Sequence, residues 1–176
     1  HHVLTTFESA TLARHAVSVL PGGALIHAVA DGDVTLQDIT FLDQRAKDDL
    51  AAYLAERDLP PSTAGLLEDA RQRGVHTFAV DYDAITEALA GDTIDKARAS
   101  RALNTIAVAV SCALLDYDAE ALARALEKIF SGRAKIVDMN VEAVRLAYDY
   151  VERELDREGF EHRLQAMPSD AQLVLI

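Results

Sequence analysis

The amino-acid sequence predicts an α/β domain with three layers, α/β/α, around a mostly parallel sheet, and with a helical C-terminal half. The first observation is a βαβ pattern, in which β-rich residues 3–7 and 24–29 flank an amphipathic helix over 8–20. The strands of such a unit are parallel and its crossover is right-handed. The second observation is a β-rich run at 75–80, and the third is the helical spacing of apolar residues after residue 84. Half of the 176 residues are apolar, which suffices for one core.

Turn residues mark the end of the first predicted helix, and a weak alternation of apolar residues marks the segment that follows the second strand. The first predicted helix ends at the Pro-Gly-Gly sequence of 21–23, which breaks helical structure. Its apolar face consists of Leu12, Ala16, Val19 and Leu20. Residues 34–42 alternate so weakly that they predict either an edge strand or an extended loop.

Two further helices and a strand complete the N-terminal half. A helix is predicted over 43–59, and the two prolines that follow it end it. The apolar side of this helix comprises Leu50, Tyr53 and Leu54. Ser62 or Thr63 can cap the next helix, which Gly74 terminates. The strand at 75–80 is expected in the middle of the sheet.

The second half of the chain predicts only helices, after a short one near 84–91. Residues 102–115 are apolar nearly all round, which predicts a helix buried on several sides. Asp118 can cap the next helix, and the last long helix runs from about Ala134 to Arg157. The stripe of the helix after Asp118 is Leu122, Leu126, Ile129 and Phe130. The seam of the last helix, spaced by four and three residues, is Val137, Val141, Val144, Tyr148, Val151 and Leu155.

The charge and the cysteine content argue against several functions. The net charge is -12, so the chain repels polyanions, and neither nucleic acid nor a membrane is expected as a partner. The sequence has no apolar run of the roughly 18 residues that span a bilayer and shows no secretory signal, so a cytoplasmic location is expected. A single cysteine, Cys112, excludes a disulfide within the chain and a thiolate metal site.

The sequence shows no nucleophile with its base. Its serines lack the glycine spacing of a nucleophile elbow, and its histidines match no metal motif. Asp81 and Asp83 follow a predicted strand, where open α/β sheets gather ligands. Asp83 also suits the N-cap of a helix that starts at Ala84, and this structural interpretation is favoured. We therefore do not expect the chain alone to be catalytic.

Two asparagines in apolar helices are candidate polar contacts. Asn104 interrupts the apolar helix of 102–115, and Asn140 lies beside the seam of the last helix, so both are expected to be buried. A buried amide without a partner costs about 1–3 kcal/mol. Each asparagine therefore needs either the backbone of another helix or a ligand, and the structural role is favoured.

The sequence Ser131–Asn140 places two cations, Arg133 and Lys135, between two helices of an acidic chain. It predicts either an anion-binding loop or a simple joint. A cation in the first turn of a helix opposes the macrodipole by about 0.3–1 kcal/mol, and the same charge after the preceding helix gains a similar amount. Because the two effects nearly cancel, charge alone does not require a ligand. Gly132 and the free N–H groups suit an anion, and Asp138 is the rival partner of Lys135.

Four stretches follow one another in an order that resembles a known domain: VLTTFESATLARHAVSVLPGGALIHAV, FAVDYDAI, RALNTIAVAVSCALL and IFSGRAKIVDMNVEAVRLAYDYV. In this order, the four stretches resemble the gamma-type domain of the 2-oxoacid:ferredoxin oxidoreductases, which form the pyruvate and 2-oxoglutarate ferredoxin oxidoreductase family. They are most similar to the alpha subunit, in which this domain precedes the pyrimidine domain of the thiamine-pyrophosphate type. The resemblance covers Val3 to about Val151. It implies a gamma-type domain over 3–158 without its glycine-rich N-terminal part, and a linker with the first strand of a following domain over 159–176.

The resemblance also implies an activity for the whole enzyme. It implies oxidative decarboxylation of a 2-oxoacid with coenzyme A, which gives an acyl-CoA and passes electrons through an iron–sulfur cluster to ferredoxin. It implies that thiamine diphosphate, magnesium and the cluster belong to other domains or subunits. The partners it implies are the beta subunit, ferredoxin and the remaining domains of the alpha subunit.

The resemblance implies roles for four residues. Arg133 and Lys135 are candidate anion contacts for coenzyme A, whose entrance lies near this domain in relatives. Asn104 and Asn140 are candidate structural polar contacts. The alternative is an α/β module without a redox role that binds a small molecule or assembles subunits.

Overall fold

A computed structural model describes residues 3–91 and 94–164 of the chain. Its sheet contains three parallel strands, β1 (Val3–Thr5), β2 (Ala24–Ala28) and β3 (His76–Val80), in the order β1-β2-β3. Ala24 lies opposite Val3 on one side and His76 on the other. The parallel pairing of β1 with β2 confirms the βαβ unit that the sequence predicts.

The middle strand of the described sheet is β2, so the prediction that the strand at 75–80 is central is wrong. All five residues of β2 are buried, whereas Ala79 of β3 is exposed. A strand that is covered on both faces is apolar without interruption. The sequence Ala-Leu-Ile-His-Ala of β2 meets this description better than the sequence of β3 does.

Helices from the N-terminal half cover one face of the sheet. They are α1 (Ser9–His15), which continues as the 3₁₀ turn η1 (Ala16–Ser18), α2 (Gln44–Ala55) and α3 (Thr63–Gln72). Leu25 of β2 belongs to the core on this face, together with Leu12 of α1 and Leu66 of α3. We call this the first core.

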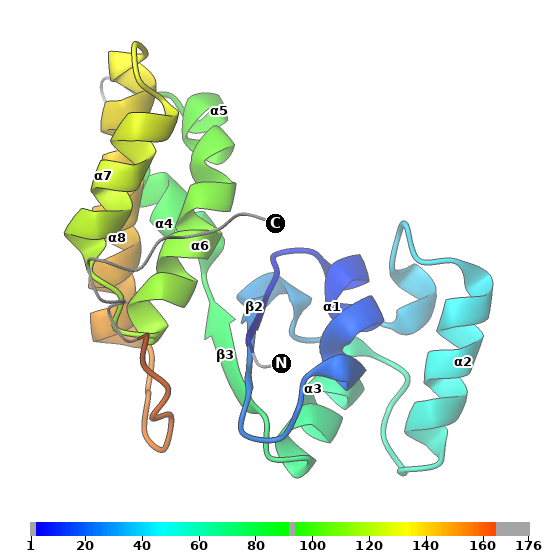
Figure 1. Ribbon diagram of the computed structural model, residues 1–176. Coiled ribbons are helices and arrows are strands. Elements are labelled where there is room, and N and C mark those ends of the chain that lie inside the picture. Colours follow the sequence, from blue (N-terminus) through cyan, green and yellow to red (C-terminus); the bar gives the residue numbers. More distant parts are fainter. Residues whose placement is uncertain (1–2, 92–93, 165–176) are drawn as a thin grey trace, which may run out of the picture.

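Helices from the second half cover the other face, as Figure 1 shows. They are α4 (Tyr82–Leu89), α5 (Lys96–Ala99), the 3₁₀ turn η4 (Ser100–Ala102), α6 (Leu103–Leu114), α7 (Ala119–Ile129) and α8 (Ala134–Glu154). Ile26 of β2 and Val80 of β3 lie in this second core. Because Leu25 and Ile26 point to opposite faces, the sheet is buried between two helical layers. The predicted three-layer fold with a helical C-terminal half is confirmed.

Residues 34–42 form a loop, which is one of the two predicted alternatives. After the 3₁₀ turn η2 (Val29–Asp31), this loop contains a second 3₁₀ turn, η3 (Leu36–Asp38), and an isolated antiparallel bridge between Thr35 and Ser62. The Thr63 N–H donates to the Val34 carbonyl over 2.9 Å. These bonds attach the loop to the start of α3.

The predicted helix boundaries of the first half agree with the structure only in part: the helix predicted over 43–59 ends at Ala55, because Asp58 takes a left-handed φ of +57° that ends helical structure. Asp43 caps α2 by accepting a bond from the Ala46 N–H, and Ser62 caps α3. Gly74 ends α3 with a φ of +78°, a conformation that glycine adopts without a Cβ clash. Leu20 is 49% exposed, so its predicted place on the apolar face is wrong. The reason is the change to 3₁₀ geometry and then to extended backbone after His15, which turns later residues away from the α-helical face.

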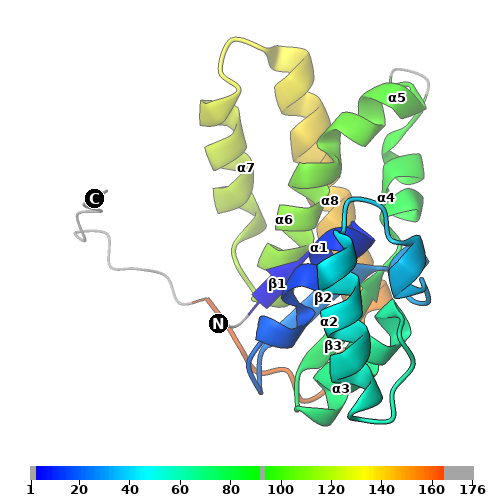
Figure 2. The same ribbon diagram turned by 90° about the vertical axis from the view of Figure 1, so that its right-hand side faces the viewer.

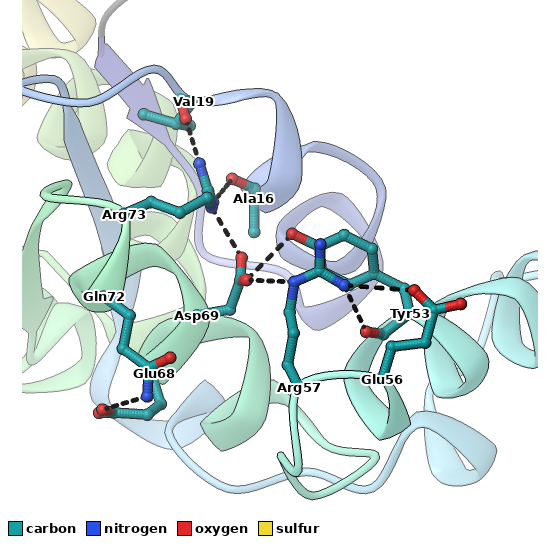
Figure 3. A network of polar contacts seen from close by, with 9 residues as sticks. All are labelled: Ala16, Val19, Tyr53, Glu56, Arg57, Glu68, Asp69, Gln72 and Arg73. Atoms are coloured by element: carbon teal, nitrogen blue, oxygen red, sulfur yellow. Dashed lines mark hydrogen bonds and ion pairs between the residues drawn. The ribbon is translucent and has the colours of Figure 1, made fainter.

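A buried carboxylate, that of Asp69, joins α3 to α2 and η1 (Figure 3). Asp69 Oδ2 lies 2.8 Å from Arg73 Nε, and Oδ1 accepts a bond from the Tyr53 hydroxyl over 2.9 Å. Arg73 also donates to the carbonyls of Ala16, the first residue of η1, and of Val19, which follows η1. Every polar group that meets at this point is paired, so the network holds the first helical layer together.

Helix α8 packs on α6 through a face centred on small residues. The fully buried residues of α8 are Met139, Asn140, Ala143, Val144, Ala147 and Val151. The predicted seam shares only Val144 and Val151 with this face, and its other members are half-buried along one side. The small side chains of Ala143 and Ala147 let α6 approach, so the buried face is centred on them instead of on the larger residues.

Helix α7 lies on the outside of the second layer. Asp118 caps it, as predicted, by accepting a bond from the Glu120 N–H over 3.0 Å. Leu122 and Leu126 are half-buried against the second core, whereas Ile129 is 69% exposed. Of the predicted stripe, Leu122, Leu126 and Phe130 are therefore half-buried, and Ile129 alone faces solvent.

The chain returns to the sheet after α8. Phe160 is 2% exposed and lies edge-on to Phe78 of β3, with 5.4 Å between the ring centroids. The His162 Nε2–H donates to the Gly22 carbonyl over 2.6 Å, and the Leu164 N–H donates to the Leu115 carbonyl over 2.8 Å. The strand-like residues 173–176, assigned to a following domain, lie outside the described residues.

Candidate functional site

A cavity of about 1010 Å³ lies between the start of α6 and the start of α8. Arg98 of α5 and Arg101 of η4 line one side, and Phe130 and Lys135, at the junction of α7 with α8, line the other. Gly132 forms this junction with a φ of +79°, so the chain reverses there within a few residues. Figure 2 shows α5 and the tip of the α7–α8 hairpin at the same end of the helical layer, with α6 between them.

The apolar lining of the cavity comes from both sides. Phe130, Ile136 and Met139 contribute from the α7–α8 side, and Ile94 contributes from the segment before α5. Cavities of several hundred cubic ångströms with an apolar lining and a few polar groups are typical of small-molecule sites. The size and the lining of this cavity fit an organic molecule the size of a cofactor.

Three cations converge on the cavity: Arg98, Arg101 and Lys135. Arg98 Nε lies 3.3 Å from Asp95 Oδ2 in an exposed pair, which leaves most of its guanidinium available. For Arg101 and Lys135, the described residues offer no carboxylate oxygen within 4 Å. Three cationic side chains thus line one cavity, although the net charge of the whole chain is -12.

Two carboxylates also line the cavity, and one of them is paired outside it. Glu142 lies 2.7 Å from Arg145, and this hydrogen-bonded arginine lowers the pKa of the Glu142 carboxyl. Asp138, the predicted rival partner of Lys135, is exposed and forms no ion pair with it among the residues that the structure describes. The lining thus holds three cations and two acids, and Arg101 and Lys135 are the two cations without an ion-pair partner among the described residues.

The two predicted cations have different positions. Lys135 lines the cavity, whereas Arg133 is exposed and lies outside its lining, at the N-cap of α8. The Arg133 side chain makes no capping bond, and the first turn of α8 contains no acidic residue. The partial positive charge of the helix N-terminus therefore adds to that of Lys135.

The two predicted asparagines also differ. Asn140 is 3% exposed at the edge of the cavity, and both ends of its amide are bonded, since its Nδ2 donates to the Ile136 carbonyl over 2.8 Å and its Oδ1 accepts from the Thr105 hydroxyl. Asn104 is exposed and lines the cavity, so the prediction that it is buried is wrong. The reason is that the first turn of α6 has one side open to the cavity, although its sequence is apolar.

The carboxylates after β3 are structural in their geometry. Asp81 Oδ1 accepts a bond from the Ala84 N–H over 2.9 Å and caps α4, which starts at Tyr82. The prediction that Asp83 is the cap is therefore wrong, because Asp83 already lies in the first turn of the helix. The Asp81 N–H in turn donates to the Tyr150 hydroxyl.

Other titratable groups lie apart from the cavity. His27 is buried, and this burial lowers its pKa, while its Nδ1–H donates to the Ala28 carbonyl over 2.8 Å. Burial raises the pKa of the Cys112 thiol. Within residues 3–91 and 94–164, His, Cys, Asp and Glu side chains form no group of three that could hold a metal ion. No helix of this part of the chain combines the length and the apolar character needed to cross a bilayer.

Sequence reasoning found Lys135 but missed Arg98 and Arg101. The signal that could have found them is their spacing, because residues three apart lie on the same side of a helical turn. Nothing in the sequence indicates that these two arginines lie across the cavity from Lys135. This placement depends on how the α7–α8 hairpin packs beside α6.

The chain is a three-layer α/β domain whose cavity brings three cationic side chains together with apolar ones. The chain belongs to the pyruvate ferredoxin/flavodoxin oxidoreductase family, whose model matches residues 2–150. Over 173 residues it is 28% identical to subunit alpha of 2-oxoacid:ferredoxin oxidoreductase 2 from Aeropyrum pernix. The alignment covers 96% of this chain and 26% of that subunit, so the chain spans about a quarter of the relative's length.

Proposed function

We propose that this chain is a domain of the alpha subunit of a 2-oxoacid:ferredoxin oxidoreductase. The complete enzyme decarboxylates a 2-oxoacid with coenzyme A, forms an acyl-CoA and reduces ferredoxin. The observation that carries this proposal is the similarity to an alpha subunit of such an enzyme along nearly the whole chain. The family match over residues 2–150 supports the same assignment over the alternative of a module without a redox role.

In this proposal the chain supports the reaction without carrying it out. Thiamine diphosphate, magnesium and the iron–sulfur cluster belong to other domains of the alpha subunit or to the beta subunit. The contribution of this domain is a rigid scaffold that packs on those parts. The proposal includes a cytoplasmic location and excludes nucleic acid as a partner, since the net charge of -12 repels it.

The cavity gives the domain a second role, that of binding the anionic part of coenzyme A. Arg98, Arg101 and Lys135 suit phosphate groups, because cationic donors make short and strong hydrogen bonds to phosphate oxygens. Phe130 and Met139 offer apolar surface beside them. Arg133 adds positive charge just outside the lining and is a weaker contact in this proposal.

The assignment is tested by purifying the full-length subunit that contains this chain. We expect a beta subunit with bound thiamine diphosphate to copurify with it, and the complex to reduce ferredoxin when a 2-oxoacid and coenzyme A are both present. Pyruvate and 2-oxoglutarate are the first substrates to compare. A stable monomer that copurifies with no such partner would contradict the proposal.

A further inference from the structure

Phe41 presents a large aromatic side chain to solvent. It is 89% exposed, which is the highest value among the large apolar residues that the structure describes. It lies in the loop between η3 and α2, drawn in light blue ahead of α2 in Figure 1. An exposed phenyl ring gains nothing for the fold of this domain, because it buries no apolar surface.

The backbone holds Phe41 in a conformation that bulky residues avoid. Its φ is +60°, in the left-handed region. Ile39 and Leu42 on either side are buried in the first core, and the Arg14 guanidinium donates to the Phe41 carbonyl. Asp43, two residues on, caps α2. The loop is therefore fixed on both sides, and the Phe41 ring cannot fold back onto its own core.

Strained residues persist where the surrounding structure determines them, and they concentrate at functional sites. Two exposed charged side chains lie near Phe41: Arg14, whose guanidinium donates to the Phe41 carbonyl, and Asp38, three residues earlier in the sequence. An apolar anchor with a polar rim is the usual form of a docking contact. We propose that Phe41 is the anchor by which this domain docks into an apolar pocket of another domain of the same polypeptide.

The choice of a domain on the same polypeptide follows from the size of the contact. One buried phenyl ring contributes less free energy than two separate molecules lose on association. A covalently linked domain avoids most of this loss, because its effective concentration is high. The chain aligns with only 26% of the length of the relative, so the proposed subunit contains further domains on the same polypeptide. The inference thus rests on the proposal that this chain is part of a longer subunit.

Photo-crosslinking in the full-length protein tests this inference. Phe41 is replaced by p-benzoylphenylalanine, and the crosslinked peptides are identified by mass spectrometry. We expect a crosslink within the same polypeptide to an apolar residue outside residues 1–176. The control is the same replacement at Glu120 of α7, whose side chain is 86% exposed. A crosslink to a separate subunit, to a second copy or within residues 1–176, or a yield no higher than that of the control, overturns the inference.

A second variant covers the case in which the photoreactive residue disturbs folding. Asparagine tolerates the left-handed region, so Phe41→Asn keeps the loop while it removes the ring. We expect amide hydrogens of one domain outside residues 1–176 to exchange at least about threefold faster in this variant. Unchanged exchange throughout those domains overturns the inference. If the unmodified protein lacks the beta subunit or has no activity, this result contradicts the proposed function. It does not affect the crosslinking and exchange results, which concern contacts within one polypeptide.

Discussion

The hydroxyl group of Tyr82 is buried in the second core and has no hydrogen-bond partner among residues 3–91 and 94–164. Burial raises the pKa of this phenol, with a smaller contribution from Tyr150. A buried polar group without a partner costs about 1–3 kcal/mol. We therefore expect Tyr82→Phe to leave the free energy of unfolding unchanged or to raise it by about 1 kcal/mol, as measured by urea denaturation. The edge contact with the Phe7 ring remains in this variant.

Tyr150→Phe is the matched control for Tyr82→Phe. The Tyr150 hydroxyl accepts a bond from the Asp81 N–H over 2.9 Å, so its removal leaves that donor unpaired. We expect this variant to lose about 1 kcal/mol. An equal loss in the two variants would contradict the account of Tyr82.

Residue types predicted caps well but predicted burial poorly. Ser62 and Asp118 cap helices as expected, because the capping bond is local, whereas the cap of α4 is Asp81 instead of the predicted Asp83. Asn104 and Asn140 have similar apolar neighbours in the sequence, yet one is exposed and the other is buried. The difference depends on which part of α6 the α7–α8 hairpin covers, and this is not encoded near either residue.

Between elements, the Asp69 network is the polar contact that holds α2, α3 and η1 together. Asp69→Asn removes the charge and leaves Arg73 and Arg57 without their buried partner. Breaking a buried pair by the loss of one partner typically costs about 3–5 kcal/mol, and because both arginines are partly exposed here we expect about 2–4 kcal/mol. The measurement is the free energy of unfolding of the purified chain in urea.

Glu68→Gln controls for the loss of a negative charge on the same helix. Glu68 pairs with Arg71 at 3.0 Å on the surface of α3. Exposed pairs contribute about 0–1 kcal/mol, so we expect a change within about 0.5 kcal/mol. If both variants lost the same small amount, the Asp69 network would not have the structural role described above.

The order of elements was predictable from sequence, whereas their packing was only partly so. The βαβ pattern gave the parallel strands, because its hydrophobic period and its Pro-Gly-Gly stop are local. The position of β3 at an edge depends on which strands pair, and the sequence of a single strand does not state this. The buried face of α8 is centred on Ala143 and Ala147, which a search for large apolar residues passes over.

Considered as a whole molecule, the chain combines a net charge of -12 with a local cluster of three cations. The average charge predicts repulsion of polyanions and says nothing about one cavity. Folding brings Arg98 and Arg101 opposite Lys135, about 35 positions apart in the sequence. The family, in contrast, was predictable because the order of four stretches survives in the sequence, and the match over residues 2–150 confirms it.

The central claim is that this cavity binds the anionic part of coenzyme A in the assembled oxidoreductase. It is tested most directly by the KM for coenzyme A of the Arg101→Ala, Lys135→Ala double variant. We expect this KM to rise about tenfold or more with kcat within about twofold, because the two cations hold phosphate in the bound state and take no part in the chemistry.

Two single variants serve as controls for the double variant. Arg124→Ala, which removes an exposed arginine of α7 that lies outside the cavity, is expected to leave the KM for coenzyme A unchanged. Arg133→Ala is expected to raise this KM less than the double variant does, because Arg133 lies outside the lining. We expect the KM for coenzyme A to rise in the double variant, and an unchanged KM together with a lowered melting temperature would contradict the binding of coenzyme A in this cavity.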